Sequence, residues 1–244
     1  MSGLRVAWLS GGVSSAIATY LARPDWAVYI DVANQHPDTL RFVMDCRDVL
    51  DCPITILRDQ RYAGSVDNVI LDKGFVNSPY GAPCTLELKK RVRQGFERAL
   101  LEQGNDEMSY IFGYDAGETS RAERIGRNLA CGCEFPLIEK GMSKQDCHGY
   151  LSDVLGIPRP EMYDLGYSNN NCIGCVKGGK GYWNKIRRDF PEVFQRRARE
   201  ERMVGGSCIS GVYLDELDPD AGNMASEVLP QCSFFCGEWG PDGG

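Results

Sequence analysis

Eleven cysteines in 244 residues are the feature of this sequence with the clearest potential for chemistry. Two of them, Cys172 and Cys175, are separated by two residues in a loop rich in Gly, Asn and Lys. This Cys-x-x-Cys spacing lets two thiolates bind one metal, and it occurs in zinc sites and in iron–sulfur proteins. An odd number of cysteines cannot pair completely within one chain. We therefore expect reduced thiols and metal or sulfur chemistry instead of a disulfide framework.

Histidine is scarce, because the sequence contains only His36 and His148. A zinc enzyme with a histidine cluster or a Ser/His/Asp hydrolase would need more than these two side chains supply. The hydrophobic fraction of 43%, the charged fraction of 25% and the net charge of -7 are ordinary for a globular protein. No apolar run approaches the roughly 18 residues of a membrane span, and residues 1–6 show no signal-peptide pattern. We expect a cytoplasmic protein without a membrane partner.

A second chemical signal is the segment Ser-Gly-Gly-Val-Ser-Ser at residues 10–15, between a predicted strand and a predicted helix. Gly11 and Gly12 allow a sharp turn and a close approach of the backbone to an anion, and the following helix offers unpaired N–H groups. The hydroxyls of Ser10, Ser14 and Ser15 add donors. The segment is neither a Walker loop nor a dinucleotide fingerprint. It predicts a phosphate or pyrophosphate site, with a plain glycine-rich turn as the alternative.

Strands that alternate with helices must position these residues. Short apolar runs bounded by turn residues predict buried parallel strands, and apolar residues at helical spacing predict the helices between them. The predicted strands are residues 4–9, 26–32, 54–57, 110–113 and 135–138, and the predicted helices are residues 14–21, 39–50, 86–102 and 120–129. This alternation indicates a doubly wound, mostly parallel α/β sheet, with a nucleotide at its C-terminal edge.

The composition changes after about residue 165. Residues 1–165 are predicted to form the nucleotide-binding α/β domain, and residues 166–244 a C-terminal extension with a Cys-x-x-Cys loop, a basic helix and an irregular tail. The basic helix, residues 182–202, is interrupted near Pro191. Residues 177–202 contain nine Lys or Arg against four Asp or Glu. Such a surplus indicates an anionic partner, either phosphate, sulfate or a nucleic-acid backbone, with a solvated helix face as the alternative.

Taken together, the motifs resemble the PP-loop superfamily (adenine nucleotide alpha-hydrolase-like), and within it the phosphoadenosine-phosphosulfate (PAPS) reductase-like family. Five segments carry the resemblance, in family order, over roughly residues 4–190. They are Ser-Gly-Gly-x-x-Ser at 10–15, Asn-Gln-His-Pro-Asp-Thr at 34–39, Gly-x-x-x-x-Glu-x-x-Arg at 113–121, Pro-Leu at 136–137 with Ser-Lys-Gln-Asp at 143–146, and Cys-x-x-Cys at 172–175. One departure is Ser14, where many PP-loops have an aspartate.

The resemblance implies a Rossmann-like fold that binds an adenine nucleotide. ATP or a sulfonucleotide would be the substrate, with Mg²⁺ as a candidate companion ion. Arg121 and Lys144 lie in matched segments and would act in catalysis. Arg121 and Arg124 would neutralise charge on a bound phosphate, with ion pairing to Glu118 and Glu123 on the helix surface as the alternative. The residues implied in nucleotide binding are Ser10, Gly11, Gly12, Ser14, Ser15, Asn34, His36, Gly113 and Arg124.

The resemblance also implies a [4Fe-4S] cluster, with zinc as the alternative metal. Cluster-bearing sulfonucleotide reductases have a Cys-Cys pair before a basic helix, and here Cys84 is followed by threonine, so one ligand of that pattern is missing. Cys84, Cys172 and Cys175 would be three metal ligands. Either one iron stays open, which would suit sulfur transfer, or the tail supplies a fourth ligand, for which we take Cys232; Cys236 is a second tail candidate.

Three functions follow from these expectations. The first is an ATP-dependent, adenylylating sulfurtransferase acting on a nucleic acid or a small molecule. The second is a thioredoxin-dependent adenylyl-sulfate or PAPS reductase, in which Cys236 would be the nucleophile, although the tail lacks the Glu and His that flank this cysteine in such reductases. The third is a non-catalytic nucleotide- or cluster-binding subunit of a modification system. A thioredoxin-like reductant and a second copy of the chain are further candidate partners.

Overall fold

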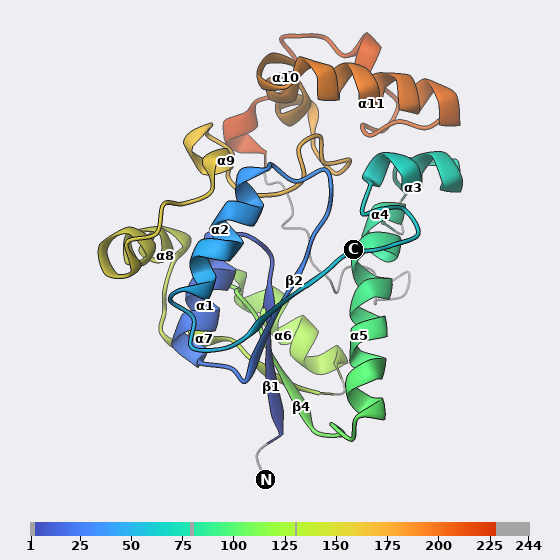
Figure 1. Cartoon of the computed structure of the whole chain (residues 1–244). Coiled ribbons are helices and arrows are strands. Elements are labelled where there is room, and N and C mark those ends of the chain that lie inside the picture. The colour runs from blue at the N-terminus through green and yellow to red at the C-terminus, as the bar shows by residue number, and fades with distance from the viewer. Residues whose placement is uncertain (1–2, 79–80, 130, 228–244) are drawn as a thin grey trace. The chain divides into compact units, whose positions relative to one another are not determined.

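The computed structural model describes residues 3–78, 81–129 and 131–227 (Figure 1). In chain order its elements are β1 (Leu4–Leu9), α1 (Val13–Ala22), β2 (Trp26–Ile30), α2 (Asp38–Arg47), β3 (Ile54–Leu57), α3 (Val66–Lys73), α4 (Pro83–Thr85), a π-helical turn (Leu86–Lys90), α5 (Arg91–Glu102), β4 (Met108–Ile111), a 3₁₀ turn (Ala116–Glu118), α6 (Thr119–Asn128), β5 (Gly132–Glu134), α7 (Pro136–Glu139), α8 (Lys144–Tyr150), a second π-helical turn (Leu151–Leu155), α9 (Glu161–Asp164), α10 (Lys180–Asp189), α11 (Pro191–Val204) and two further 3₁₀ turns (Leu214–Glu216 and Met224–Ser226).

The chain divides into two compact units, each of which is assembled from separate segments. The first unit contains Met1–Asp31, Pro37–Leu57 and Gln94–Asn170, and the second contains Val32–His36, Arg58–Arg93 and Asn171–Gly244. The last segment of the second unit begins five residues after the boundary predicted from composition, at residues 165/166. The second unit also takes two earlier segments of the chain.

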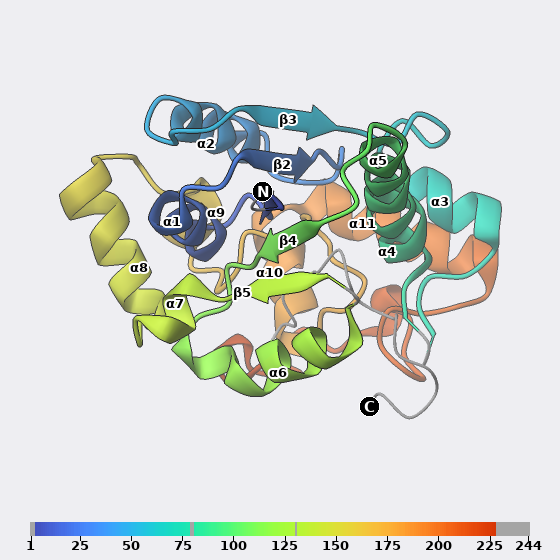
Figure 2. The same ribbon diagram turned by 90° about the horizontal axis from the view of Figure 1, so that it is seen from below.

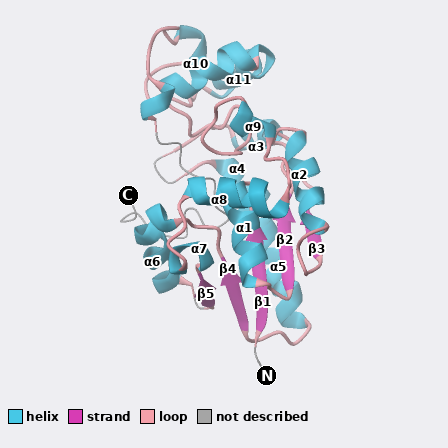
Figure 3. Ribbon diagram, turned by 90° about the vertical axis from the view of Figure 1, so that its left-hand side faces the viewer, coloured by secondary structure: helices cyan, strands magenta, loops and turns pink. Residues whose placement is uncertain are grey.

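A parallel sheet forms the centre of the first unit. In the described residues it has five strands in the order β3-β2-β1-β4-β5, and every neighbouring pair is parallel. Figure 3 shows the strands β1, β2 and β4 running in the same direction. The order reverses between β1 and β4, because β1 is followed by strands on one side and β4 continues on the other. The predicted doubly wound α/β fold is therefore confirmed.

Helices cover both faces of this sheet (Figure 2). On one face, α1 and α2 bury the main apolar core, which includes Ala7, Ile17, Tyr29, Phe42 and Leu137. On the other face, Phe96 of α5 meets Trp8 and Trp26 edge-on at centroid distances of 6.0 and 5.7 Å. Strands buried on both sides explain why β1 and β2 read as continuous apolar runs instead of alternating ones.

The predicted strand at residues 135–138 is wrong. The fifth strand is Gly132–Glu134, and the following residues form α7, with Pro136 at its first turn. Proline has no N–H to donate to a strand ladder, but the first turn of a helix does not use that donor. The other four predicted strands and the four predicted helices are present, with ends shifted by a few residues.

Helix α11 packs against α3 in the second unit through a buried ion pair. Arg197 is 1% exposed and donates from Nη2 to Asp67 Oδ1 at 2.8 Å and from Nη1 to Glu200 Oε2 at 2.6 Å. The break predicted near Pro191 is confirmed, since α10 ends at Asp189 and α11 begins at this proline. Several cations of the basic segment bond to acceptors of their own unit, namely Lys185, Arg187, Arg196, Arg197 and Arg202. None of the helices in the described residues combines the length and apolar character of a membrane-crossing segment.

Candidate functional site

Serine side chains close the loop that follows β1. Ser15 Oγ accepts from the backbone N–H of Ser10 at 3.0 Å and donates to the carbonyl of Gly12 at 2.8 Å. Gly11 has a φ of 79°, a left-handed conformation that favours glycine. Gly12 is the N-cap residue of α1 and makes no side-chain hydrogen bond to the first turn, and that turn holds no acidic residue. The loop and the positive end of the α1 dipole together form a site that suits a phosphate.

The loop lies where the strand order of the sheet reverses. It follows β1, and Gly113 follows the neighbouring strand β4. A Cβ atom on Gly113 would lie 2.4 Å from Ser15 Cα and 2.6 Å from Ser15 N, so the two loops are in direct backbone contact. Ligands of open α/β sheets bind in the crevice at such a switch point. The structure thus brings Gly113 into contact with the serine–glycine loop.

Two residues that the sequence did not indicate, Asn170 and Tyr163, hydrogen-bond to the backbone of the loop. Asn170 Nδ2 donates to the Gly11 carbonyl at 2.7 Å and to Thr39 Oγ1 at 3.0 Å, and its side chain is buried. The Tyr163 hydroxyl accepts from the backbone N–H of Val13 at 3.4 Å, and burial raises the pKa of this tyrosine. A run of three asparagines at residues 169–171 is the only local signal, and it does not say which amide is buried.

Replacement of Asn170 by alanine is expected to loosen this loop. The change leaves the carbonyl of Gly11 without its buried donor, which costs about 1–3 kcal/mol. We expect a lower midpoint of urea unfolding and, by isothermal titration, weaker binding of ATP, the ligand that the resemblance implies. Asn128→Ala is the matched control, because that exposed amide bonds only to the Arg124 carbonyl among its described contacts. Equal effects of the two variants would contradict the assigned role of Asn170.

The two implied catalytic cations both have partners in the first unit. Lys144, at the start of α8, donates to the Ser168 carbonyl and, at 2.6 Å, to Asn169 Oδ1. Burial lowers the pKa of Lys144 from its usual value, with Asp115 and Glu118 acting in the opposite direction. Arg121 pairs with Glu118 at 2.6 Å and lies over the Tyr114 ring at 4.4 Å. The implied nucleotide ligand Arg124 is exposed on α6.

Cys147 also lies near the loop, in α8. Its side chain is fully buried and hydrogen-bonds to Ser14, and burial raises the pKa of its thiol to about 11. A thiol with such a pKa carries almost no thiolate at neutral pH, so Cys147 is a packing residue. Ser14 and Ser15 are likewise buried, and their hydroxyls are used inside the protein.

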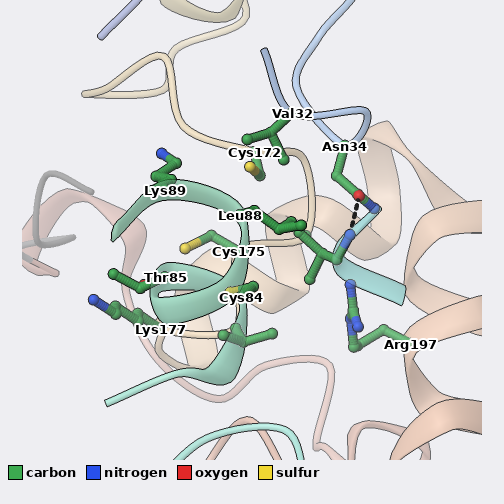
Figure 4. Close-up of a pocket in the computed structure, with 13 residues that line it drawn as sticks. Val32, Asn34, Cys84, Thr85, Leu88, Lys89, Cys172, Cys175, Lys177 and Arg197 are labelled. Carbon is green, nitrogen blue, oxygen red and sulfur yellow. Dashed lines mark hydrogen bonds between the residues drawn. The ribbon is translucent and has the colours of Figure 1, made fainter. Parts of the chain in front are cut away.

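The second unit brings the three predicted cysteine ligands to one cavity. Cys84 comes from α4, whereas Cys172 and Cys175 come from the loop before α10, and all three line the same space (Figure 4). The other residues around it are mostly apolar or cationic: Val32, Asn34, Val66, Thr85, Leu88, Lys89, Gly174, Val176, Lys177 and Arg197. Cys84 and Cys172, which are 88 positions apart in the chain, thus line the same cavity. The sequence alone implied this proximity only through the resemblance.

The Tyr182 side chain holds the Cys-x-x-Cys loop through hydrogen bonds to its backbone. The Tyr182 hydroxyl accepts from the Cys175 N–H at 2.9 Å and donates to the Cys172 carbonyl at 3.1 Å. Between the cysteines, Gly174 has a φ of 71°, and a Cβ there would lie 2.7 Å from Val193 Cγ1. The loop therefore needs glycine at this position for both its conformation and its packing.

Asn34 and His36, implied in nucleotide binding, belong to this second unit. Asn34 Oδ1 accepts from the Val66 N–H at 2.8 Å, and its amide donates to Asp67 at 3.2 Å. Its carbonyl accepts from the Ile173 N–H at 2.8 Å, so Asn34 ties α3 to the cysteine loop. The His36 ring lies 6.2 Å from the Phe190 ring.

The donor set of the cavity fits a thiolate-bound metal, since three soft sulfur ligands suit zinc or an iron–sulfur cluster. Among the described residues, however, no three Cys, His, Asp or Glu side chains are gathered closely enough to hold a metal ion. The thiols as placed line the space without meeting at a common centre. Cys232, the predicted fourth ligand, and Cys236, the predicted nucleophile, lie outside the described residues.

Cys208 is a further cysteine of the second unit. It is buried, its N–H donates to Glu201 Oε1 at 2.5 Å, and its thiol also bonds to this carboxylate. Burial, followed by the Glu201 charge, raises the pKa of the Cys208 thiol. Cys208 does not line the cysteine cavity. Cys208→Ser is therefore a suitable control for variants of the three cysteines that do.

No protein-family model matches this sequence, and no curated protein sequence matches it. Among solved structures, the chain is similar to a phosphoadenylyl-sulfate (PAPS) reductase from Candida auris, described as a phosphate complex. The TM-score is 0.45 and the sequence identity is 17%, over 69% of this chain and 80% of that chain. From its own geometry, the first unit belongs to the class of doubly wound parallel α/β proteins with a glycine-rich loop at the switch point.

Proposed function

We propose that this protein is a PAPS reductase-like PP-loop enzyme that uses ATP to activate an acceptor for sulfur transfer. One observation carries the proposal: Cys84, Cys172 and Cys175, implied as metal ligands by the resemblance, line a single cavity. The serine–glycine loop at the switch point of the sheet supports the nucleotide part, because it presents a helix N-terminus where such folds bind phosphates.

In this proposal the first unit binds ATP. The loop after β1 holds the phosphates, with Gly11 and Gly12 allowing the backbone to approach them. An acceptor oxygen attacks the α-phosphorus, pyrophosphate leaves, and the acceptor becomes adenylylated. Hydrosulfide then attacks the acceptor atom that carries the adenylylated oxygen, a bond to sulfur forms, and AMP leaves with that oxygen. Arg121 and Lys144 would stabilise negative charge on the phosphates, which requires each cation to release part of its present bonding to Glu118 or Asn169.

The second unit would hold a [4Fe-4S] cluster through the three cavity cysteines, with Cys232 as the fourth ligand or an open iron in its place. Such a cluster would supply iron with an affinity for sulfur. The protein's own contribution is to orient the thiolates, and the Tyr182 hydroxyl does this by bonding to the backbone of both loop cysteines. Zinc at the same thiolates is the competing assignment.

Pyrophosphate release tests the nucleotide part. The protein is incubated anaerobically with ATP, Mg²⁺, sulfide and a panel of acceptors that includes tRNA, DNA fragments and small hydroxyl compounds. We expect pyrophosphate and AMP only when the right acceptor is present. Sulfite release from adenylyl sulfate or PAPS with thioredoxin, lost in Cys236→Ser, would instead establish the reductase. Binding of ATP without turnover for any acceptor would favour a non-catalytic subunit.

Metal analysis of cysteine variants tests the cluster part. Anaerobically purified protein is expected to be brown, with about four irons and four sulfides per chain. Cys84→Ser, Cys172→Ser and Cys175→Ser should each lose most of the iron and the visible absorption. Cys208→Ser keeps a hydroxyl for Glu201 and should retain both. A colourless protein with one zinc, or equal iron loss in Cys208→Ser, would contradict this ligand set.

A further inference from the structure

Two cysteines lie at the end of the sheet where the parallel strands begin, whereas the serine–glycine loop lies at the end where β1 finishes. Cys131 directly precedes β5, and Cys133 is the middle residue of this edge strand. Since the strands are parallel, the start of β5 lies at the same end of the sheet as the starts of β1 and β4. Cys131 and Gly132 line an open cleft there together with Arg5, and both thiols are partly exposed.

The two sulfur atoms face one another. Cys131 lies in the bend just before β5, and Cys133 lies in the strand. Even in a fully extended chain, the rise of about 3.3 Å per residue separates Cα atoms two residues apart by roughly 6.6 Å. That separation is at the upper end of the range a disulfide can span. Cys133 Sγ also donates to the Cys131 carbonyl at 3.6 Å, and the two thiols hydrogen-bond to each other. Gly132 between them gives the backbone the freedom to close a small ring.

The strand that carries the pair is anchored immediately afterwards. Arg5 makes a bidentate bridge to Glu134, with Nε–Oε1 at 2.9 Å and Nη2–Oε2 at 2.6 Å. Ser109 Oγ donates to the same carboxylate at 3.0 Å. Cys133 is therefore held in register with β4, whereas Cys131 lies in the bend that precedes the strand. Closure of a disulfide would move the bend and leave the sheet in place.

We propose that Cys131 and Cys133 form a redox-active dithiol that exchanges with low-molecular-weight disulfides, such as oxidised glutathione, and closes to an intramolecular disulfide. Both cysteines belong to the first unit, and they lie at the end of the sheet opposite the serine–glycine loop.

The exchange is a two-electron oxidation of the pair. The hydrogen bond from Cys131 lowers the pKa of Cys133, which makes the Cys133 thiolate the attacking group. It attacks one sulfur of the small disulfide, forming a mixed disulfide and releasing one small thiolate. Cys131 then attacks Cys133 Sγ, closing the protein disulfide and releasing the second small thiolate. The two protons of the protein thiols end on the two small thiols, so the small disulfide is reduced as the pair is oxidised.

A disulfide across a single residue is strained, which makes it easy to reduce. The pair should therefore respond to the ratio of oxidised to reduced thiol instead of remaining permanently oxidised. This behaviour distinguishes a reactive pair from two unrelated surface thiols, which would form only mixed disulfides.

Tryptic mapping gives a direct test, because Arg127 and Lys140 flank a peptide, residues 128–140, that contains these two cysteines and no other. The intact protein is equilibrated anaerobically with glutathione buffers of defined ratio, quenched in acid, alkylated and digested. We expect the unlabelled peptide, lighter by the mass of two hydrogens, to replace the doubly alkylated peptide as the buffer becomes more oxidising. Dithiothreitol should reverse the change.

Single variants separate the two roles. Cys131→Ser should accumulate a stable glutathione adduct on Cys133, because the resolving thiol is missing. Cys133→Ser should form its adduct more slowly, because the exchange rate follows the thiolate fraction of the attacking cysteine. A doubly alkylated or doubly glutathionylated peptide at every ratio would overturn the dithiol. Equal adduct rates in the two variants would overturn the assignment of Cys133 as the attacking residue. Thermal unfolding that matches the wild type checks that both variants fold.

Discussion

Gly113→Ala is expected to displace the serine–glycine loop and to weaken the proposed nucleotide binding. The added methyl group would lie 2.4 Å from Ser15 Cα and 2.9 Å from the Ser14 carbonyl carbon, and neither backbone atom can swing aside. Overpacking of this kind costs about 1–3 kcal/mol. Each charge-assisted hydrogen bond to a phosphate is worth about 1.5–3 kcal/mol, so a displaced loop should weaken ATP binding at least tenfold. Calorimetric titration with ATP and thermal unfolding measure both effects.

Gly126→Ala provides the matched control. Gly126 lies in α6, and a Cβ there meets nothing within 4 Å. Alanine is favoured over glycine in a helix by about 1 kcal/mol, so this variant should be as stable as the wild type or slightly more stable, with unchanged ATP affinity. If Gly113→Ala bound ATP as tightly as Gly126→Ala, the contact between the two switch-point loops would have no functional importance.

Arg197→Met is expected to destabilise the second unit strongly. Arg197 is 1% exposed and pairs with Asp67 and Glu200, which are themselves largely shielded from water. Removing one partner of a buried ion pair leaves an uncompensated charge and typically costs 3–5 kcal/mol. In this variant Asp67 still pairs with Arg196 at 3.0 Å, so its charge stays partly compensated. Glu200, in contrast, loses its closest cation. Urea unfolding followed by tryptophan fluorescence should show a transition at a clearly lower concentration.

The control is on the same helix. Arg202→Met removes an exposed arginine that pairs with Asp215 at 2.7 Å and with Glu216 at 2.5 Å. Surface ion pairs contribute little because water and salt screen them, so the unfolding midpoint should stay close to the wild-type value. A double variant, Arg197→Met with Glu200→Leu, should recover part of the lost stability, since apolar side chains can replace a buried pair. Equal midpoints for Arg197→Met and Arg202→Met would refute the structural role of Arg197.

Several cations of residues 177–202 have partners within the protein. From composition, the surplus of Lys and Arg in residues 177–202 indicates an anionic partner. In the structure, Arg197 is buried between two carboxylates, and Arg187 donates to the Leu217 carbonyl at 2.7 Å. The spacing of charges along a chain does not reveal which of them fold inward. The case for a nucleic-acid acceptor therefore depends on the activity assay and not on this segment.

The fold was largely predictable because its signals are local. Apolar runs, turn residues and helical spacing lie within a few residues of each other, and they led to four of the five strands. The error at residues 135–138 has a local cause too, since Phe-Pro-Leu-Ile is apolar enough for a strand while Pro136 favours the start of a helix. The glycine-rich loop was also a local signal, since Gly11 and Gly12 stand at a strand-to-helix turn.

The sequence by itself determined the parallel α/β class, the loop that suits a phosphate and the Cys-x-x-Cys spacing that suits a metal. Only the tertiary structure decided that Cys84 shares a cavity with Cys172 and Cys175, and that Asn170 supports Gly11 from 159 residues away. It also decided that Cys147 is buried, whereas Cys131 and Cys133 are partly exposed and in contact with each other. The physical reason is that burial and cavities arise from packing between distant segments, which the spacing of residues along one segment does not encode.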